Sequence, residues 1–299
     1  MAVTFRPGRF EDSPEVFRVF RDAVTELGSR LGVTTITGGD DPATLAGLWE
    51  ERRPLFEHLA RTGAHFWIAE AAGEPIGYAR STLHDGVLEL TEFFVLPGSQ
   101  SSGVGRELLA RAFPRAGERR RVVIATPDVR GLVHYLKAGC YARFPIHYFS
   151  RPARPQPPAP DLDVEPLDDS PRTFELLAQI DESVLGFRRD VDHAWLMRTR
   201  RGALYRRGGR LAGYGYAGPS NGPFAAFDEA DLPAMLAAAE AGTPPGAEFG
   251  LDVPLVNRAV VDYALAQGFR MGTFVVLFMS DAPLGRFEAY VCTTPTFFV

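Results

Sequence analysis

"TEFFVLPGSQSSGVGRELLARAF", residues 91–113, decides the fold of the first half of the chain. It opens as an apolar strand and closes as an amphipathic helix, and the turn between them holds three glycines, three serines and no charged residue. The first turn of a helix presents free backbone N–H groups and about half a positive charge. Small residues let an anion approach those groups closely, so the stretch predicts either a pyrophosphate-binding loop or a plain strand-to-helix turn.

Other motifs for phosphate, metal or nucleophilic chemistry are missing from the sequence. There is no G-x-x-x-x-G-K-[ST], and Gly103-x-Gly105 lacks the third glycine of the dinucleotide fingerprint, with Leu108 in its place. There is no H-E-x-x-H, the six histidines show no metal-ligand spacing, and the serines near Gln100 do not stand in a G-x-S-x-G elbow. We therefore predict no metal site, and the serines near Gln100 are poor nucleophile candidates.

Composition excludes several classes of protein. The net charge of −5 argues against a nucleic-acid-binding surface, which needs a basic field. No run reaches the roughly 18 apolar residues of a membrane span, and the first residues lack an apolar signal core. Cys140 and Cys292 lie far apart without a C-x-x-C partner, as is typical of thiols in a reducing compartment. The expectation is a cytoplasmic protein with neither a nucleic-acid nor a membrane partner.

A proline-rich segment at residues 151–162 divides the chain. It begins "RPARPQPPAP", with five prolines in ten residues, and such a segment favours an extended, semi-rigid spacer. With 299 residues and about 150 residues per domain, the sequence predicts one domain at 1–150 and a second at 163–299.

The apolar patterns predict the same order of elements in both halves. In the first half this order is strand, two helices, three strands, helix, strand, helix and strand. A helix crosses between the fourth and fifth strands, so these two are expected to be parallel within an otherwise antiparallel sheet. When Gly139 is aligned with Gly268, the second half repeats the pattern with little identity, which indicates a divergent duplication. The predicted fold class is mixed α/β in two similar domains.

The opening stretch resembles the core motif of the GNAT-type N-acetyltransferases, Q/R-x-x-G-x-G/A at the end of the fourth strand. "HYLKAGCYA", residues 134–142, resembles the family's YxKxGF element, with Cys140 in place of phenylalanine. The second half resembles the family in its element order and in Asn257, Leu265, Gly268 and Phe269. The chain thus looks like a tandem two-domain member, in which each domain would be a twisted, mostly antiparallel sheet. Helices would flank this sheet, and its parallel fourth and fifth strands would splay apart.

This resemblance implies an acetyl-CoA co-substrate that enters the gap between the splayed strands. The pantetheine amides would pair with backbone near Phe93 and Val95, like an added strand. The pyrophosphate would lie on the backbone amides of the glycine turn and first helical turn, which are Gln100, Ser101, Ser102, Gly103, Val104, Gly105 and Arg106.

The resemblance also suggests catalytic roles. Tyr135 matches the family's tyrosine, which would protonate the departing CoA thiolate. The base that deprotonates the amine would be Glu89, Glu92 or a water chain. Strand alternation places the two glutamates on opposite faces unless a bulge intervenes. The acceptor would be a small-molecule or peptide amine. Asp40 and Asp41 either attract such a cation or cap a helix.

The second half lacks the features that carry this chemistry. Its corresponding turn contains Asp228, Glu229 and Asp231 but no glycine, and Ala264 takes the place of Tyr135. Acidic side chains would repel a pyrophosphate. We therefore predict a degenerate second domain that binds no CoA and either shapes the acceptor pocket or forms a homodimer interface.

Two functions follow for the whole chain. The first is an acetyl-CoA-dependent N-acetyltransferase with an active first domain. The alternative is a non-catalytic acyl-CoA-binding or sensory protein that retained the loop. A Tyr135→Phe variant separates them, because only an enzyme would lose amine-dependent thiol release while it still bound CoA.

Overall fold

The computed structural model describes residues 2–32, 42–100, 103–154 and 159–293, with the side chains of 42–45 not included. The chain divides into two compact units, Met1–Tyr141 and Ala142–Val299, which are described separately below. None of the helices in the described ranges is long and apolar enough to cross a membrane.

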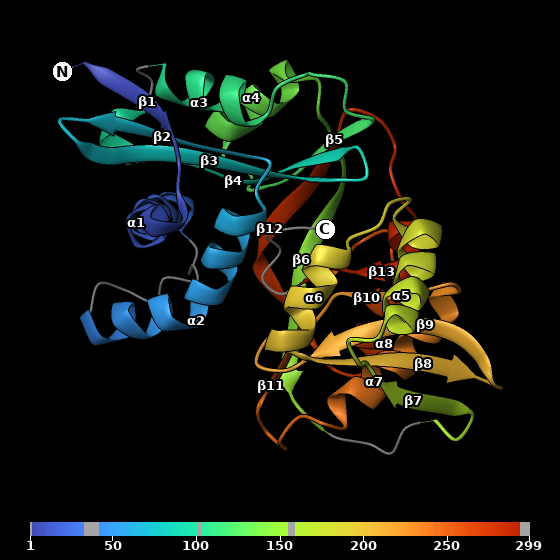
Figure 1. The fold of residues 1–299 in the computed structure, drawn as a ribbon. Coiled ribbons are helices and arrows are strands. Elements are labelled where there is room, and N and C mark those ends of the chain that lie inside the picture. Colours follow the sequence, from blue (N-terminus) through green and yellow to red (C-terminus); the bar gives the residue numbers. More distant parts are fainter. Residues whose placement is uncertain (1, 33–41, 101–102, 155–158, 294–299) are drawn as a thin grey trace. The chain divides into compact units, whose positions relative to one another are not determined.

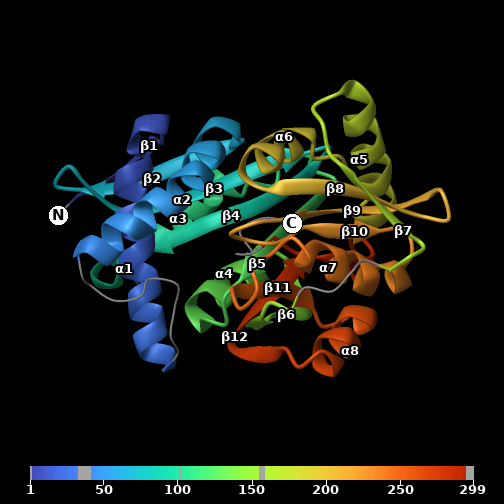
Figure 2. The ribbon, with the colours of Figure 1, turned by 90° about the horizontal axis from the view of Figure 1, so that it is seen from below.

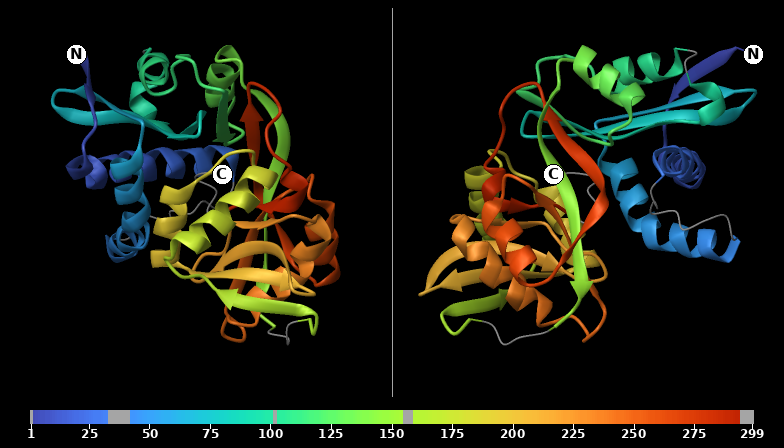
Figure 3. Two further views of the ribbon diagram at one scale, coloured as in Figure 1. Left: turned by 45° about the vertical axis from the view of Figure 1, so that its right-hand side comes forward. Right: turned by 180° about the vertical axis from the view of Figure 1, so that it is seen from behind.

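The first unit is a five-stranded sheet with helices on both faces. Its elements are β1 (Val3–Pro7), α1 (Ser13–Leu31), α2 (Pro42–Thr62), β2 (His65–Ala71), β3 (Glu74–His84), β4 (Val87–Val95), α3 (Val104–Ala112), β5 (Arg120–Ala125) and α4 (Val129–Lys137) (Figure 1). The strands follow one another in the order β1-β2-β3-β4-β5, and only β4 and β5 are parallel. Helices α1 and α2 cover one face of this sheet, and α3 and α4 cover the other (Figure 3). The predicted mixed sheet with one parallel pair is confirmed.

Helix α1 shows how the sequence pattern fixes this packing. Pro14 lies in its first turn, where a missing N–H costs nothing, and Gly32 ends it with a left-handed φ of 65°. Five apolar residues on its inner face are buried, namely Val16, Phe17, Val19, Phe20 and Val24. The Phe20 ring meets Phe94 of β4 edge-on at 5.1 Å, so α1 is anchored to the strand that lines the site.

The second unit repeats the predicted order of elements. It contains β6 (Tyr141–Pro152), β7 (Leu162–Pro166), α5 (Pro171–Val184), α6 (Asp190–Thr199), β8 (Arg201–Arg207), β9 (Arg210–Ala217), β10 (Phe224–Ala226), α7 (Leu232–Glu240), β11 (Glu248–Pro254), α8 (Arg258–Ala266), β12 (Arg270–Ser280) and β13 (Tyr290–Val291). Five strands form one sheet in the order β13-β10-β9-β8-β7, with α5 and α6 on one face and α7 on the other (Figure 2). Strands β12, β6 and β11 lie side by side in that order.

Strand β6 is longer than the proline pattern suggests. It pairs antiparallel with β11 from Ile146 opposite Pro254 to Pro152 opposite Glu248, so it includes the first two residues of the expected linker. The last strand predicted for the first half is therefore present, and it pairs with a strand from the second half of the chain. The described units meet at 141/142, and the expected boundaries near 150 and 163 stay a prediction.

The second unit also contains a strand that the sequence pattern did not predict, β13. It pairs with β10, with Phe224 opposite Val291 and Ala225 opposite Tyr290. The next residue, Cys292, forms a bridge with Asp252 of β11. The C-terminal segment therefore lies between the two strands whose counterparts in the first unit are the parallel pair.

Candidate active site

The parallel strands β4 and β5 separate part of the way along their length. They pair from Val87 opposite Arg120 to Leu90 opposite Val123, and the residues beyond do not pair. Strand β4 nevertheless continues to Val95, held on its other side by β3. The splayed gap expected from the resemblance is therefore present in this unit.

A β-bulge lies where the two strands begin to separate. On β3 and β4, Arg80 pairs with Glu92 but Ser81 pairs with Leu90, so Thr91 is the extra residue. Because of this insertion, Glu89 and Glu92 oppose Thr82 and Arg80, which share one face of β3. The two glutamates therefore lie on the same face of β4. Strand alternation alone would have placed them on opposite faces, and the bulge is what brings them together.

The glycines of the turn serve two different purposes. Gly103 caps α3 with a φ of 86°, a conformation that residues with a side chain rarely adopt. Gly105 has negative φ, but a methyl group there would lie 3.1 Å from Cζ of Phe93. A side chain at position 105 would therefore press on the Phe93 ring, which would have to shift by a few tenths of an ångström. The turn is fixed further by Gln100, whose Nε2 donates to the Val95 carbonyl at 3.0 Å.

A cavity of about 530 Å³ opens between these elements. Six of the predicted cofactor-binding residues line it, namely Phe93, Val95, Gln100, Gly103, Gly105 and Arg106. Val104 is buried and does not line it, and Ser101 and Ser102 lie outside the described residues. The remaining wall comes from α1, β4, the residues after β5, and α4, namely Ala23, Glu26, Leu27, Phe94, Thr126, Asp128, Val129, Arg130, Gly131, Val133, His134 and Tyr135.

Tyr135 is the predicted catalytic residue that lies in this cavity. Its side chain is buried, and its ring contacts Phe93 at a centroid distance of 6.2 Å. Its hydroxyl makes no hydrogen bond with any residue in the described part of the chain. Burial, together with the charge of Asp128, raises the pKa of the Tyr135 hydroxyl above its ordinary value. The phenol is therefore protonated at neutral pH and able to donate.

The two candidate bases lie elsewhere in the unit. Both are buried, and neither lines the cavity. Glu92 accepts a hydrogen bond from the Tyr78 hydroxyl at 2.9 Å and a very short one from Nε of Arg80. Asp40 and Asp41, considered as acceptor ligands, fall outside the described residues.

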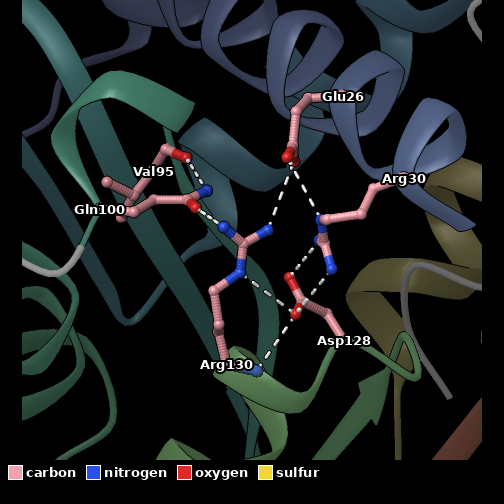
Figure 4. A network of polar contacts seen from close by, with 6 residues as sticks. All are labelled: Glu26, Arg30, Val95, Gln100, Asp128 and Arg130. Atoms are coloured by element: carbon pink, nitrogen blue, oxygen red, sulfur yellow. Dashed lines mark hydrogen bonds and ion pairs between the residues drawn. The ribbon is translucent and has the colours of Figure 1, made fainter.

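Four charged side chains at the edge of the cavity form a ring of alternating sign (Figure 4). Arg30 contacts Glu26 at 3.2 Å and Asp128 at 2.9 Å, and Arg130 contacts the same two carboxylates at 3.4 Å and 3.3 Å. Asp128 also caps α4, because its Oδ1 accepts the backbone N–H of Arg130 at 3.1 Å. Burial alone would raise the pKa of Asp128, but the amide and guanidinium of Arg130 lower it below the ordinary value. Arg130 finally donates a very short hydrogen bond to Oε1 of Gln100.

His134 is a cavity residue that sequence reasoning missed. Its ring meets Phe93 edge-on at 5.9 Å, and its Nε2 would lie 3.5 Å from a methyl group on Gly105. Burial, with a smaller contribution from Lys137, lowers the pKa of His134. The available signal was its position next to Tyr135 on a helix that was already predicted to face the site. In the described ranges, no group of three or more metal-ligating side chains is present.

Comparison with known proteins identifies this architecture. Residues 38–139 match the model of the acetyltransferase (GNAT) family. The chain carries a GNAT domain. A search of the curated proteins found no match.

Similarity to solved structures extends the GNAT fold to the second unit. A proposed acetyltransferase from Pyrococcus horikoshii matches with a TM-score of 0.71 at 16% identity, over 96% of this chain and 92% of that one. A tandem GNAT protein from the clavulanic acid biosynthesis pathway matches with a TM-score of 0.59 at 15% identity, over 94% and 99%. A GCN5-related N-acetyltransferase from Sphaerobacter thermophilus matches with a TM-score of 0.56 at 13% identity, over 95% and 97%. At these identities the fold is what is shared, and it is a tandem GNAT fold.

Proposed function

We propose that the first unit is an acetyl-CoA-dependent N-acetyltransferase that transfers the acetyl group directly to a primary amine. The observation that carries this proposal is a single cavity that contains three features. These are the unpaired edge of β4, the glycine turn that starts α3, and a buried tyrosine hydroxyl with no partner among the described residues. The match to the GNAT family model supports acyl transfer in general. We add to it that the transferred group is acetyl and that the acceptor is a primary amine.

In this proposal the co-substrate extends the sheet. Pantetheine amides pair with the backbone of Phe93 and Val95, whose β5-facing side has no strand partner. The pyrophosphate lies on the amides from Gln100 to Arg106, at the positive end of α3. Arg106 is exposed at the rim, where its charge faces the same phosphates.

Transfer then needs two proton movements. The neutral amine attacks the thioester carbonyl carbon, so a C–N bond forms and the C–S bond breaks. Tyr135 gives its proton to the thiolate, and the attacking nitrogen loses one to a base. Because neither Glu89 nor Glu92 lines the cavity, we assign this second step to water rather than to a carboxylate.

The second unit is proposed to be non-catalytic. Its place for a co-substrate, between β10 and β11, is occupied by β13, and Gly222 before β10 lies so close that a methyl group would be 2.1 Å from the Cys292 carbonyl oxygen. This unit would shape the acceptor pocket or form a homodimer interface.

Calorimetric titration of the full chain with acetyl-CoA tests the proposal, followed by thiol release with a panel of small-molecule and peptide amines. Binding at one site per chain with amine-dependent thiol release is the expected result. Binding without thiol release for any amine would favour the non-catalytic acyl-CoA sensor. Absence of binding would overturn both.

A further inference from the structure

Arg130 is the second residue of α4, and its side chain reaches the glycine turn, with the guanidinium at the cavity wall (Figure 4). One of its nitrogens bonds Gln100, the first residue of the turn, and another contacts Glu26 of α1. The side chain therefore bridges the mouth of the gap between β4 and β5, where an acyl-CoA would pass from its pantetheine arm to its phosphates.

The contact between Arg130 and Glu26 is the weak point of the charged ring. It measures 3.4 Å, against 2.9 Å for Arg30 with Asp128, and both partners are partly exposed, at 40% and 30% of the side chain. Ion pairs of this exposure contribute little to stability, so a stronger anion can replace the carboxylate. Glu26 would not be left alone, because Arg30 also contacts it at 3.2 Å.

We propose that Arg130 binds a phosphate group of the acyl-CoA, and that Glu26 competes with this phosphate for the guanidinium. The inference rests on the proposed acyl-CoA site. The planar guanidinium matches a phosphate in two parallel hydrogen bonds, and a phosphate of CoA offers more acceptor oxygens than a carboxylate. Once Arg130 turns to the phosphate, Arg30 remains with the carboxylates of Glu26 and Asp128, so these three side chains together carry a net charge of −1. That charge favours a cationic amine as the second substrate.

The experiment measures CoA affinity by calorimetry in the full chain. Arg130→Gln should weaken binding about tenfold or more, since a charge-assisted hydrogen bond to phosphate is lost. Glu26→Gln should strengthen binding about threefold to tenfold, because the competing carboxylate is gone. In the double variant the gain from Glu26→Gln should vanish, as the two changes act on one interaction. Titration with dephospho-CoA, which lacks the 3′-phosphate, shows which phosphate Arg130 binds. If it binds the pyrophosphate, the variants change the affinity for dephospho-CoA as they change that for CoA. If it binds the 3′-phosphate, they leave the affinity for dephospho-CoA unchanged.

Glu57→Gln is the matched control. Glu57 is also a helical glutamate with 30% of its side chain exposed and two arginine neighbours, Arg53 and Arg61, but it does not line the cavity. It should leave CoA affinity unchanged. If Arg130→Gln unfolds the chain, Arg130→Lys keeps the charge and should give intermediate affinity.

Three results are decisive. Weaker CoA binding by Glu26→Gln would show that the ring is only a brace between α1 and α4, and would overturn the inference. Unchanged affinity in both single variants would also overturn it, while the proposed function would stand. If the wild-type chain fails to bind CoA, the proposed function itself is wrong, and the inference falls with it.

Discussion

Arg80 and Glu92 face each other across β3 and β4 and form an ion pair with no solvent exposure. The guanidinium is surrounded by the rings of Phe56, Phe66 and Tyr78, at 4.8–5.5 Å from their centroids. A charge in such a place is tolerated only while its counter-ion remains. Glu92 is therefore held in the sheet interior, one residue past the bulge that opens the gap.

The first prediction is that Glu92→Gln lowers stability rather than chemistry. The free energy of unfolding should fall by about 3–5 kcal/mol, the usual cost of leaving a buried charge unpaired. Tyr78→Phe removes only one hydrogen bond to the same carboxylate and should cost about 1 kcal/mol. Denaturant unfolding measures both. A Glu92→Gln protein that is as stable as the wild type but has lost turnover would instead mark Glu92 as the base.

Tyr135→Phe should reduce acyl transfer by about a hundredfold or more, since a positioned general acid contributes about 10²–10⁴-fold. The hydroxyl makes no hydrogen bond among the described residues, so its removal should leave the thermal midpoint nearly unchanged. Steady-state thiol release and CoA titration are the two measurements. Loss of CoA binding in parallel with activity would show that the hydroxyl holds the co-substrate instead of donating a proton.

Alanine at either of the two glycines of the turn, Gly103 or Gly105, should destabilise the protein, but for different reasons. A different second choice of residue should therefore restore stability at each position. Gly103→Ala should cost about 1–2 kcal/mol from left-handed backbone alone, because no atom of the described residues lies within 4 Å of the added methyl, and Gly103→Asn should cost less. Gly105→Ala should cost about 1–3 kcal/mol by crowding Phe93, and a second change, Phe93→Leu, should recover part of it. The thermal midpoints of the wild type and these four variants distinguish backbone strain at Gly103 from side-chain crowding at Gly105. If Gly103→Asn cost as much as Gly103→Ala, or if Phe93→Leu recovered none of the loss at position 105, this assignment would be contradicted.

His134 should make the first unit less stable in mild acid. Its pKa is lowered by burial in the folded state, so unfolding takes up a proton when the pH falls below the ordinary histidine value of about 6.5. Stability is therefore lost as the pH falls through the window between the ordinary and the lowered pKa. Relative to His134→Gln, the wild type should lose stability as the pH falls below about 6.5. Lys137→Gln should reduce this difference in stability between the wild type and His134→Gln. If the difference did not change with pH, titration of His134 would not contribute to stability.

The sequence predicted the elements and the turn because local chemistry decides them. A proline at the start of α1, a glycine after it and the small residues before α3 act within a few residues of themselves. The bulge at Thr91 could not be predicted, because it depends on how two strands pair and leaves no local signature. Glu89 and Glu92 were candidate bases through the family resemblance, and their place relative to the cavity depends on the same long-range pairing, which buries both outside it.

Long-range pairing explains the remaining differences. Strand β13 spans two residues, too few to show a periodic pattern, and its partner β10 lies far away in the sequence. The charged ring joins residues about 100 positions apart on α1 and α4, so only the folded chain brings Glu26 to Arg130. Both features emerge from the topology of the sheets.

The last prediction concerns the second unit, which should bind no CoA even when its acidic turn is neutralised. Calorimetry of the wild type should give one CoA per chain. Replacement of Asp228, Glu229 and Asp231 by amides should keep that value, because β13 still fills the space between β10 and β11. A control variant, Gly105→Ala in the first unit, should weaken the one remaining site. If the neutralised variant bound two CoA molecules, charge rather than strand β13 would be what closes the second unit, and β13 would have to be displaceable.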